Sequence, residues 1–189
     1  MKVLDTRLPG VKRIQPAVHA DERGYFLESF RADRYQELLG LTQPFVQSNC
    51  SHSKYGVLRG LHFQALHPQG KLLHVTRGEI FDVVVDLRSA SPTFAQWEGI
   101  TLSGQSQEQL WIPPGLAHGF VVLSEEADVA YQCTDYYQPG DEACLRWDDP
   151  GLAITWPITQ PLVSAKDRQG LSLRALQAAE RLPLAAYHP

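Results

Sequence analysis

The strongest constraint on the fold is a succession of short β-like segments that fills the chain from residue 44 to about residue 147. Each segment is rich in apolar residues, and clusters rich in Gly, Pro, Ser or Asp separate the segments. Many short strands with few helices are typical of an antiparallel sandwich or barrel, and we expect a mainly β protein, a double-sheet jelly roll. The segments are residues 45–51, 57–63, 71–76, 79–88, 94–102, 108–113, 118–124 and 128–137.

One of these segments indicates how the strands lie in the sheet. The odd-numbered residues from Phe81 to Leu87 are all apolar, whereas their even-numbered neighbours include Asp82 and Asp86. Alternation with a period of two predicts that one face packs in the core and the other meets solvent or a pocket. Asp82 could therefore point into the barrel and support a catalytic group, or belong to a solvent-facing ladder.

Two segments have a helical pattern. Residues 31–40 form a run of helix-forming residues that ends on Gly40, and residues 172–182 are rich in Ala, Leu, Arg and Glu and stop before Pro183. We expect a short helix in each segment.

The size and the charge of the chain set further limits. With 189 residues and 43% hydrophobic residues, we expect one domain over residues 1–189, with an N-terminal arm (about 1–45) and a helical tail (about 165–189). A net charge of -4 argues against nucleic acid or an anionic membrane as a partner, since both require a surplus of Lys and Arg. The sequence has no apolar stretch long enough to predict a signal peptide or a membrane span, so we expect a cytoplasmic protein.

The cysteines do not form a recognisable pattern. Cys50, Cys133 and Cys144 are an odd number and show no CxxC spacing, so we expect partly buried thiols rather than a disulfide framework. A zinc site built from Cys50, His52 and His62 remains open, although its spacing is not diagnostic.

The segment GVLRGLHFQ (residues 56–64) carries polar residues inside an apolar strand. Strict alternation would place Arg59 and His62 on opposite faces of that strand. Both can serve one pocket only if Gly60 forms a bulge or the strand ends there.

The spacing of polar residues resembles the two-part pattern of the cupins, which are small jelly rolls. Gly56 and His62 have the spacing of the first cupin motif, and Pro113, Gly115 and His118 match the second. No phosphate-binding glycine loop of the Rossmann or P-loop type and no GxSxG motif is present.

Departures from the cupin pattern concern the metal ligands. Gln64 stands where the second histidine is expected, and Lys71 stands where the carboxylate is expected. An amide is a poor ligand for a transition-metal ion such as zinc, and an ammonium repels any cation. We therefore expect no metal at this site. His62 and Lys71 are then expected to face one cavity.

Several motifs, in order along the chain, resemble the dTDP-4-dehydrorhamnose 3,5-epimerase family. The resemblance runs from about residue 8 to residue 170 and rests on residues 56–71, 80–88, 111–124, 130–137, 146–157 and 162–167. It implies a metal-free and cofactor-free homodimer that inverts C3 and C5 of dTDP-4-keto-6-deoxy-D-glucose. The product would be dTDP-4-keto-L-rhamnose, on the route to dTDP-L-rhamnose.

The chemistry of such an epimerase agrees with the residues that the resemblance supplies. Removing a proton next to a ketone requires a base, a positive charge that stabilises the enolate, and an acid on the opposite face. The resemblance implies that His62 is the base, oriented by Asp167, that Lys71 lies at the C4 oxygen, and that Tyr131 is the acid.

The resemblance also implies a set of binding residues. Arg23 and Arg59 would hold the diphosphate, because guanidinium groups suit phosphate oxygens. The thymidine would meet Glu28, Gln47 and Asn49 together with the Ser48 and Arg59 backbone, and Tyr137 would stack on the thymine. His118 would approach the sugar or support His62, and Glu142 and Lys166 would close the far side. The family usually has Asp at the position of Ser48.

Other interpretations remain open. The nearest is a monofunctional 3- or 5-epimerase of another dTDP-deoxysugar pathway, and the others are a metal-dependent cupin oxygenase and a non-catalytic sugar-binding jelly roll. Taken singly, His62, Lys71, Tyr131 and Asp167 would be ordinary structural residues. Surface or structural roles are expected for the remaining histidines, His19, His52, His67, His74 and His188.

Overall fold

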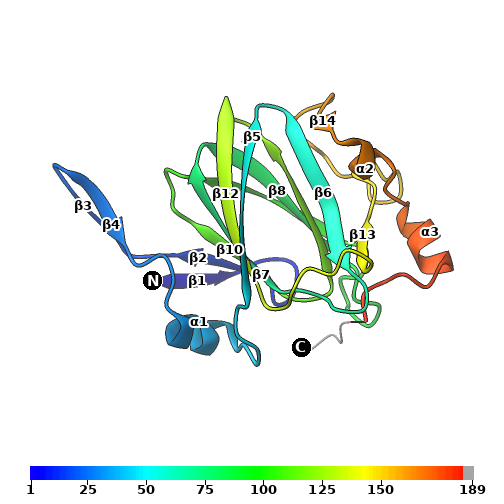
Figure 1. Cartoon of the computed structure of the whole chain (residues 1–189), viewed down its shortest axis with the longest axis horizontal. Coiled ribbons are helices and arrows are strands. Elements are labelled where there is room, and N and C mark those ends of the chain that lie inside the picture. The colour runs from blue at the N-terminus through cyan, green and yellow to red at the C-terminus, as the bar shows by residue number, and fades with distance from the viewer. Residues whose placement is uncertain (185–189) are drawn as a thin grey trace.

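The structure is a computed structural model that describes residues 1–184, shown in Figure 1. The last part of the expected helical tail, residues 185–189 with His188, lies outside the described residues. The strands are β1 (Lys2–Asp5), β2 (Lys12–Gln15), β3 (Val18–Asp21), β4 (Gly24–Leu27), β5 (Gln47–Lys54), β6 (Val57–Gln64), β7 (Lys71–Arg77), β8 (Glu79–Asp86), β9 (Trp97–Ser103), β10 (Gln109–Ile112), β11 (Leu116–Val122), β12 (Glu126–Cys133), β13 (Glu142–Cys144) and β14 (Leu162–Val163). The helices are α1 (Ala32–Leu39), α2 (Ala165–Arg168) and α3 (Leu173–Ala178).

Two six-stranded sheets face each other and form the jelly roll. The first sheet has the order β1-β2-β10-β7-β12-β5, and the second has the order β13-β6-β11-β8-β9 with β14 added beside β6. Pairing is antiparallel except between β14 and β6. Every segment expected to be a strand overlaps one, so the predicted mainly β, cupin-like jelly roll is confirmed.

The main hydrophobic core lies between the two sheets. Leu73 and Val75 from β7 pack in one buried cluster with Ile80 and Val84 from β8. The even-numbered face of β8 therefore points into the barrel, and Asp82 lies on that face. Burial of these side chains supplies the main driving force that holds the sheets together.

The odd-numbered face of β8 is also buried, which alternation alone did not indicate. Val83 and Val85 pack outside the barrel in a second cluster with Leu176 of α3. The expected solvent-facing side is absent from this strand because the C-terminal segment covers one face and the opposite sheet covers the other. Of the two possibilities for Asp82, the barrel interior is the correct one.

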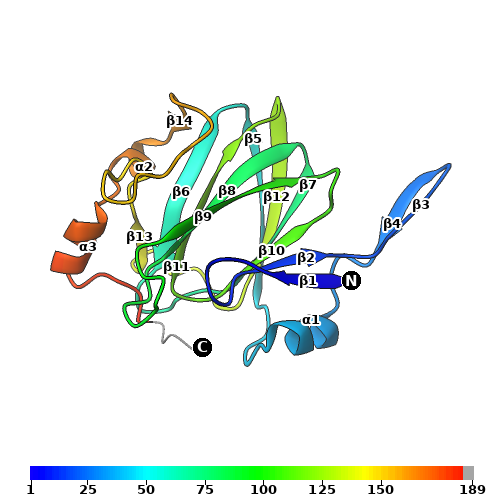
Figure 2. The ribbon, with the colours of Figure 1, turned by 180° about the vertical axis from the view of Figure 1, so that it is seen from behind.

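The N-terminal region is more integrated than an arm. β1 and β2 extend the first sheet through pairing of β2 with β10, and only the β3–β4 hairpin projects from the body (Figures 1 and 2). Helix α1 ends at Gly40, whose φ of 62° is the left-handed conformation that glycine adopts readily. Helices α1 and α3 confirm the two predicted helical segments, and no helix within residues 1–184 is long and apolar enough to cross a membrane.

A bulge in β6 brings Arg59 and His62 to the same face. The β6–β11 register pairs Arg59 with Phe120 and His62 with His118, so two residues of β6 lie opposite one residue of β11. Gly60 has a φ of +114°, and a Cβ there would lie 2.7 Å from backbone atoms of β11. Only glycine fits this close approach without strain. Of the two alternatives for this position, a bulge or an end of the strand, the structure shows the bulge.

Candidate active site

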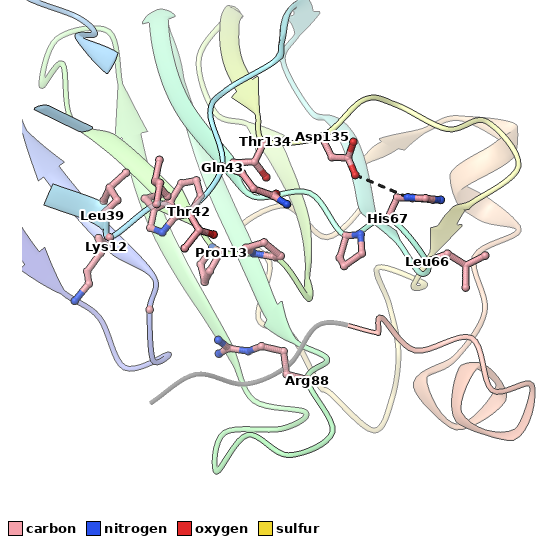
Figure 3. Close-up of a pocket in the computed structure, with 16 residues that line it drawn as sticks. Lys12, Leu39, Thr42, Gln43, Leu66, His67, Arg88, Pro113, Thr134 and Asp135 are labelled. Carbon is pink, nitrogen blue, oxygen red and sulfur yellow. Dashed lines mark ion pairs between the residues drawn. The ribbon is translucent and has the colours of Figure 1, made fainter. Parts of the chain in front are cut away.

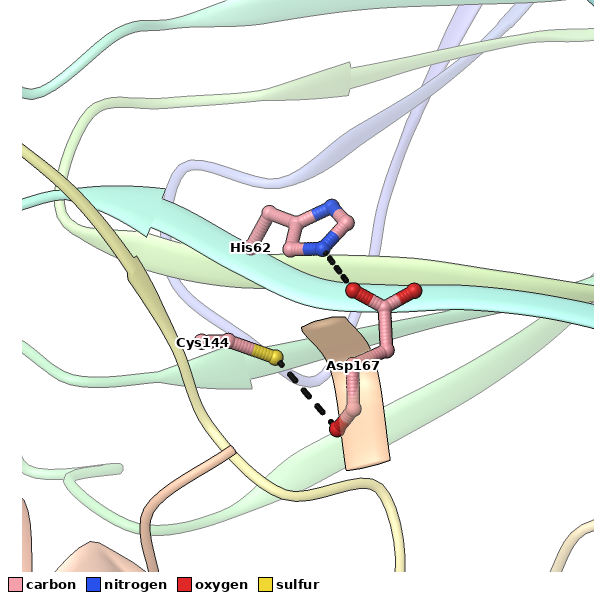
Figure 4. Close-up of side chains that lie close together, drawn as sticks. All are labelled: His62, Cys144 and Asp167. Atoms are coloured by element: carbon pink, nitrogen blue, oxygen red, sulfur yellow. Dashed lines mark hydrogen bonds and ion pairs between the residues drawn. The ribbon is translucent and has the colours of Figure 1, made fainter. Parts of the chain in front are cut away.

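A histidine–carboxylate pair links β6 to α2. Nε2 of His62 lies 2.6 Å from Oδ1 of Asp167, and the backbone N–H of Gly60 donates to the other carboxylate oxygen at 3.3 Å (Figure 4). Ser164 caps α2 by accepting a hydrogen bond from the Asp167 backbone N–H. Burial alone would raise the pKa of Asp167, but the hydrogen bond and the charge of His62 outweigh it and hold that pKa below its usual range. Among the described residues, Nδ1 of His62 has no hydrogen-bond partner.

A second pair lies beside the first. Nε2 of His118 is 2.7 Å from Oδ2 of Asp82, and both side chains are almost fully buried. The other carboxylate oxygen of Asp82 has no hydrogen-bond partner within residues 1–184. Because His118 and His62 are register partners, the two pairs occupy adjacent positions on one face of the second sheet.

Lys71 enters the interior from the opposite sheet. Its register partner on β12 is Cys133, and it shares a face with the buried core residue Leu73. The ammonium makes no hydrogen bond or ion pair with any described residue. Burial lowers the pKa of Lys71, while the nearby Cys133, Glu142 and Asp82 act in the opposite direction.

Tyr131 lies on the same interior face, two residues before Cys133 on β12. Its ring packs against the main core, and its hydroxyl has no hydrogen-bond partner in the described part of the chain. Burial, and to a smaller extent the proximity of Cys133 and Glu142, raises the pKa of Tyr131. The phenol is therefore neutral near neutral pH and carries a proton that it can donate.

Two polar residues of β5 complete this face. Gln47 and Asn49 alternate inward next to Cys133 and Tyr131, and the Gln47 amide donates to Oδ1 of Asn49 at 3.1 Å. Ser48, between them, is exposed on the outer face, so any contact with the nucleoside would involve its backbone.

Charged side chains gather at the mouth of the barrel. The Tyr137 hydroxyl donates to Glu142 at 3.0 Å, and Lys166 forms an ion pair with the same carboxylate oxygen. Burial tends to raise the pKa of Glu142, but hydrogen bonds with Lys166 and Tyr137 and the charge of His62 lower it overall. These contacts join β13, α2 and the segment after β12 beside His62.

Arg59 lies at the same opening. Its Nε donates to Ser53 at 2.9 Å, while the guanidinium remains exposed. Together with His62, Lys166 and Asp167, Arg59 lines a cavity of about 460 Å³ between β6 and the β14–α2 segment. The predicted base, its carboxylate and one predicted phosphate ligand thus border one cavity.

Arg23 and Glu28 are not brought to this site within one chain. Arg23 is on the turn of the β3–β4 hairpin, where it pairs with Asp21, and Glu28 pairs with Arg34 at 2.7 Å. The hairpin and α2 lie at opposite ends of the molecule in both views (Figures 1 and 2).

Gln64, at the position of the second cupin histidine, has a structural role in its loop contacts. Gln64 is buried and binds backbone groups, donating to the carbonyl of His67 at 2.7 Å and accepting from the N–H of Gln138 at 2.7 Å. The hypothesis of a zinc site built from Cys50, His52 and His62 is wrong. Within residues 1–184, Cys50 and His52 do not belong to a cluster of potential metal ligands with His62. Because β5 and β6 belong to different sheets, closeness in sequence did not bring them together.

Sequence reasoning gave Cys144 no role, yet it lies next to the first pair. One donor atom each from His62, Cys144 and Asp167 lies within 4.8 Å of the others. Burial and the nearby Asp167 and Glu142 raise the pKa of the Cys144 thiol to about 12. Only the pairing of β13 with β6, which places Cys144 opposite His62, could have signalled this.

A larger cavity than the one beside His62 lies elsewhere. It has a volume of about 730 Å³ and is bordered by the C-terminal end of α1 and by Trp111, Pro113 and Asp135 (Figure 3). Arg88, at its edge, is held in a buried network with Asp86. None of the predicted catalytic residues lines this cavity, so its size does not identify the active site.

The fold and the site define a cupin-like jelly roll that carries a histidine–aspartate pair beside one sheet and a buried lysine and a tyrosine on the interior face of the other. Residues 5–175 match the family model described as dTDP-4-dehydrorhamnose 3,5-epimerase. The chain belongs to the dTDP-4-dehydrorhamnose 3,5-epimerase family, as its motifs predicted.

Individual relatives agree with this assignment. The dTDP-4-dehydrorhamnose 3,5-epimerase of Pseudomonas aeruginosa is 51% identical over 90% of this chain and 94% of that protein. An epimerase of the same description from Neisseria gonorrhoeae is 51% identical over 97% of this chain, which spans only 56% of that longer protein. The crystal structure of dTDP-6-deoxy-D-glucose-3,5-epimerase from Legionella pneumophila in complex with dTDP-4-keto-L-rhamnose has a TM-score of 0.93 and 52% identity, and covers 100% of this chain and 99% of that one.

Proposed function

We propose that the protein is an isomerase that inverts C3 and C5 of dTDP-4-keto-6-deoxy-D-glucose to give dTDP-4-keto-L-rhamnose. The observation that carries this proposal is the His62–Asp167 pair, which borders a cavity between β6 and α2, while Lys71 and Tyr131 lie on the interior face of the opposite sheet. The family assignment and the ligand of the Legionella structure support it.

His62 acts as the base through Nδ1. Because Nε2 is engaged by Asp167, the neutral ring carries its proton on Nε2 and leaves the lone pair of Nδ1 free. When Nδ1 takes the proton from C3 or C5, the Asp167 carboxylate stabilises the imidazolium that forms.

Lys71 and Tyr131 complete each inversion. As the C–H bond breaks, its electron pair moves into the enolate and charge develops on the C4 oxygen, which the Lys71 ammonium stabilises in a poorly solvated interior. The Tyr131 hydroxyl then delivers a proton to the opposite face of the carbon and recovers one from solvent, while His62 releases the proton it took to solvent before the next step. C3 and C5 both flank the C4 ketone, so the same residues serve both centres.

The mouth of the barrel binds the rest of the substrate. Arg59 contacts the diphosphate, and the thymidine meets Gln47, Asn49, the backbone of Ser48 and the ring of Tyr137. Glu142 and Lys166 close the far side of the sugar, and His118, held by Asp82, supports His62 or contacts the sugar.

A homodimer supplies the remaining binding residues in this proposal. The β3–β4 hairpin exposes 58% of Tyr25 and 73% of Phe26, apolar surface that a second copy would cover. Arg23, on the same hairpin, and Glu28, just beyond it, would then reach the partner's nucleotide. Sedimentation at micromolar concentration should give twice the 21.2 kDa chain mass, and a fully active monomer would exclude a role for Arg23 across subunits.

We also expect the chain to act as one domain in the cytoplasm. The thiols of Cys50, Cys133 and Cys144 are all unpaired, which suits a reducing compartment.

Product analysis tests the proposed reaction. The purified protein is incubated with dTDP-4-keto-6-deoxy-D-glucose, and the configuration at C3 and C5 is read from proton–proton couplings by NMR. Inversion of both centres is expected, whereas inversion of one would indicate a monofunctional epimerase. An unchanged substrate that nevertheless binds would indicate a sugar-binding jelly roll.

A further inference from the structure

The cluster of His62, Cys144 and Asp167 has a composition that the epimerase reaction does not require. Its donors are an imidazole nitrogen, a thiol and a carboxylate, and they come from β6, β13 and α2. The proposed reaction uses His62 and Asp167 but has no step for Cys144. These donor types together favour zinc and similar divalent cations over magnesium or calcium.

We propose that these three residues form a binding site for a thiophilic divalent cation such as Zn²⁺, and that a cation bound there turns off the base. The second part rests on the proposed function, because it requires His62 to be the base. The first part stands on the geometry of the cluster alone.

The distances allow coordination after a small movement. Tetrahedral zinc, with bonds of about 2.0–2.3 Å, separates its ligand atoms by roughly 3.2–3.8 Å. The three donors already lie within 4.8 Å of one another, and Nε2 and Oδ1, now 2.6 Å apart, would open by roughly 0.6 Å. Figure 4 shows that the Nε2 edge of the ring faces Asp167 and that the Cys144 thiol lies on the same side.

The charges beside Cys144 favour a cation on balance. Asp167 and Glu142 both act on the Cys144 thiol, and Lys166, which is paired with Glu142, acts in the opposite direction. A water molecule would complete the coordination. The adjoining cavity beside His62 and Asp167 offers a way in for the cation and the water.

The other two cysteines do not offer an equivalent site. Cys133 lies opposite Lys71, whose ammonium repels a cation. Cys50 is exposed on the edge strand β5 and belongs to no three-donor cluster within residues 1–184. Cys50 is therefore the matched control for Cys144.

The proton balance explains why binding blocks catalysis. On coordination, the Cys144 thiol releases its proton to solvent, and the cation takes the lone pair of Nε2 while the ring proton moves to Nδ1. Nδ1 is the atom that must be unprotonated to act as base. No electron transfer takes place, so a chelator that removes the cation restores the active tautomer.

Cadmium provides a test that does not depend on activity. Titration of the protein with Cd²⁺ should produce a thiolate-to-metal charge-transfer absorption that saturates at one cation per chain. Cys144→Ser should weaken binding by about 100-fold or more, whereas Cys50→Ser should leave it unchanged. Persistence of the band in Cys144→Ser, or its loss in Cys50→Ser, would overturn the site.

Inhibition of turnover by Zn²⁺ tests whether a cation bound at this site turns off the base. Zn²⁺ at saturating concentration should lower epimerase turnover by at least about tenfold in the unmodified protein, and a chelator should reverse the loss. The Cys144→Ser variant, checked for unchanged circular dichroism and cation-free turnover, should resist the same concentration, and Mg²⁺ should have no effect. Stoichiometric Cd²⁺ binding through Cys144 without inhibition by Zn²⁺ would refute the link to the base while leaving the site in place.

Discussion

Two histidine–aspartate pairs lie side by side in this barrel and differ mainly in their access to solvent. The Nε2–carboxylate distance is 2.6 Å for His62 and Asp167 and 2.7 Å for His118 and Asp82. The His62 side chain is 28% exposed and lines a cavity, whereas the His118 side chain is only 8% exposed. Equal hydrogen bonds therefore do not imply equal roles.

The difference comes from the elements that carry the carboxylates. Asp82 is on β8, an inner strand of the second sheet, and its buried side chain lies between the two sheets, so its partner His118 is also held in the interior. Asp167 is on the short helix α2, which packs on β6 at the open end of the barrel. In the proposed mechanism, the exposed pair meets the substrate directly and the buried pair supports it.

The largest expected effect comes from removing each histidine in turn. His62→Asn should lower kcat by about 10²–10⁴-fold, because it removes the base, while the affinity for dTDP stays nearly unchanged. His118→Asn should lower kcat by less than about tenfold, since it loses only support for the base. Steady-state kinetics and calorimetric binding of dTDP provide the comparison, and equal losses in kcat would remove the distinction between the pairs.

The bulge that aligns the two pairs can be broken at Gly60. Gly60→Ala introduces a Cβ that would lie 2.7 Å from the β11 backbone at a φ of +114°, so we expect a loss of about 2–4 kcal/mol in the free energy of unfolding. Gly140→Ala is the matched control, because no atom lies within 4 Å of the added Cβ. Chemical denaturation measures both variants, and a Gly60→Ala protein as stable as the control would show that the bulge tolerates a side chain.

A smaller effect is expected on the stability that Asp167 contributes when the pH is lowered. The pKa of Asp167 is lowered in the folded protein, so its contribution to stability is complete above the ordinary carboxyl pKa of about 4 and is lost as the pH falls through the folded value. Asp167→Asn should therefore be less stable than the unmodified protein at pH 7, and the difference should shrink below about pH 4. Thermal unfolding at a series of pH values tests this, and a pH-independent difference would contradict it.

Much of the fold followed from the sequence because strand length and turn composition are local signals. The bulge at Gly60 was also predictable, since Arg59 and His62 could share a pocket only if alternation broke between them. The four-residue strands β1 to β4 were not predicted, because so short a segment carries too little periodicity. Their place in the structure depends on pairing with distant strands or with each other.

The site was predictable only in part. Family motifs supplied His62 and Asp167, and the structure brings these residues together although 105 positions separate them. Alternation alone did not show on which face of the sheet Asp82 lies. No local sequence signal indicated that Cys144 lies at the site, because its position depends on the pairing of β13 with β6. Long-range pairings of this kind are set by the whole sheet rather than by any one segment.

The most direct test of the account follows proton exchange at the sugar carbons in heavy water. If His62 removes the proton and Tyr131 returns one to the other face, the unmodified protein should place deuterium at C3 and C5 of the inverted product. Tyr131→Phe should place deuterium in unreacted substrate faster than it forms product, because His62 can still form the enolate but far-face protonation is lost. His62→Asn should show neither exchange nor inversion. Normal inversion by Tyr131→Phe, or exchange by His62→Asn, would contradict the assignment of acid and base.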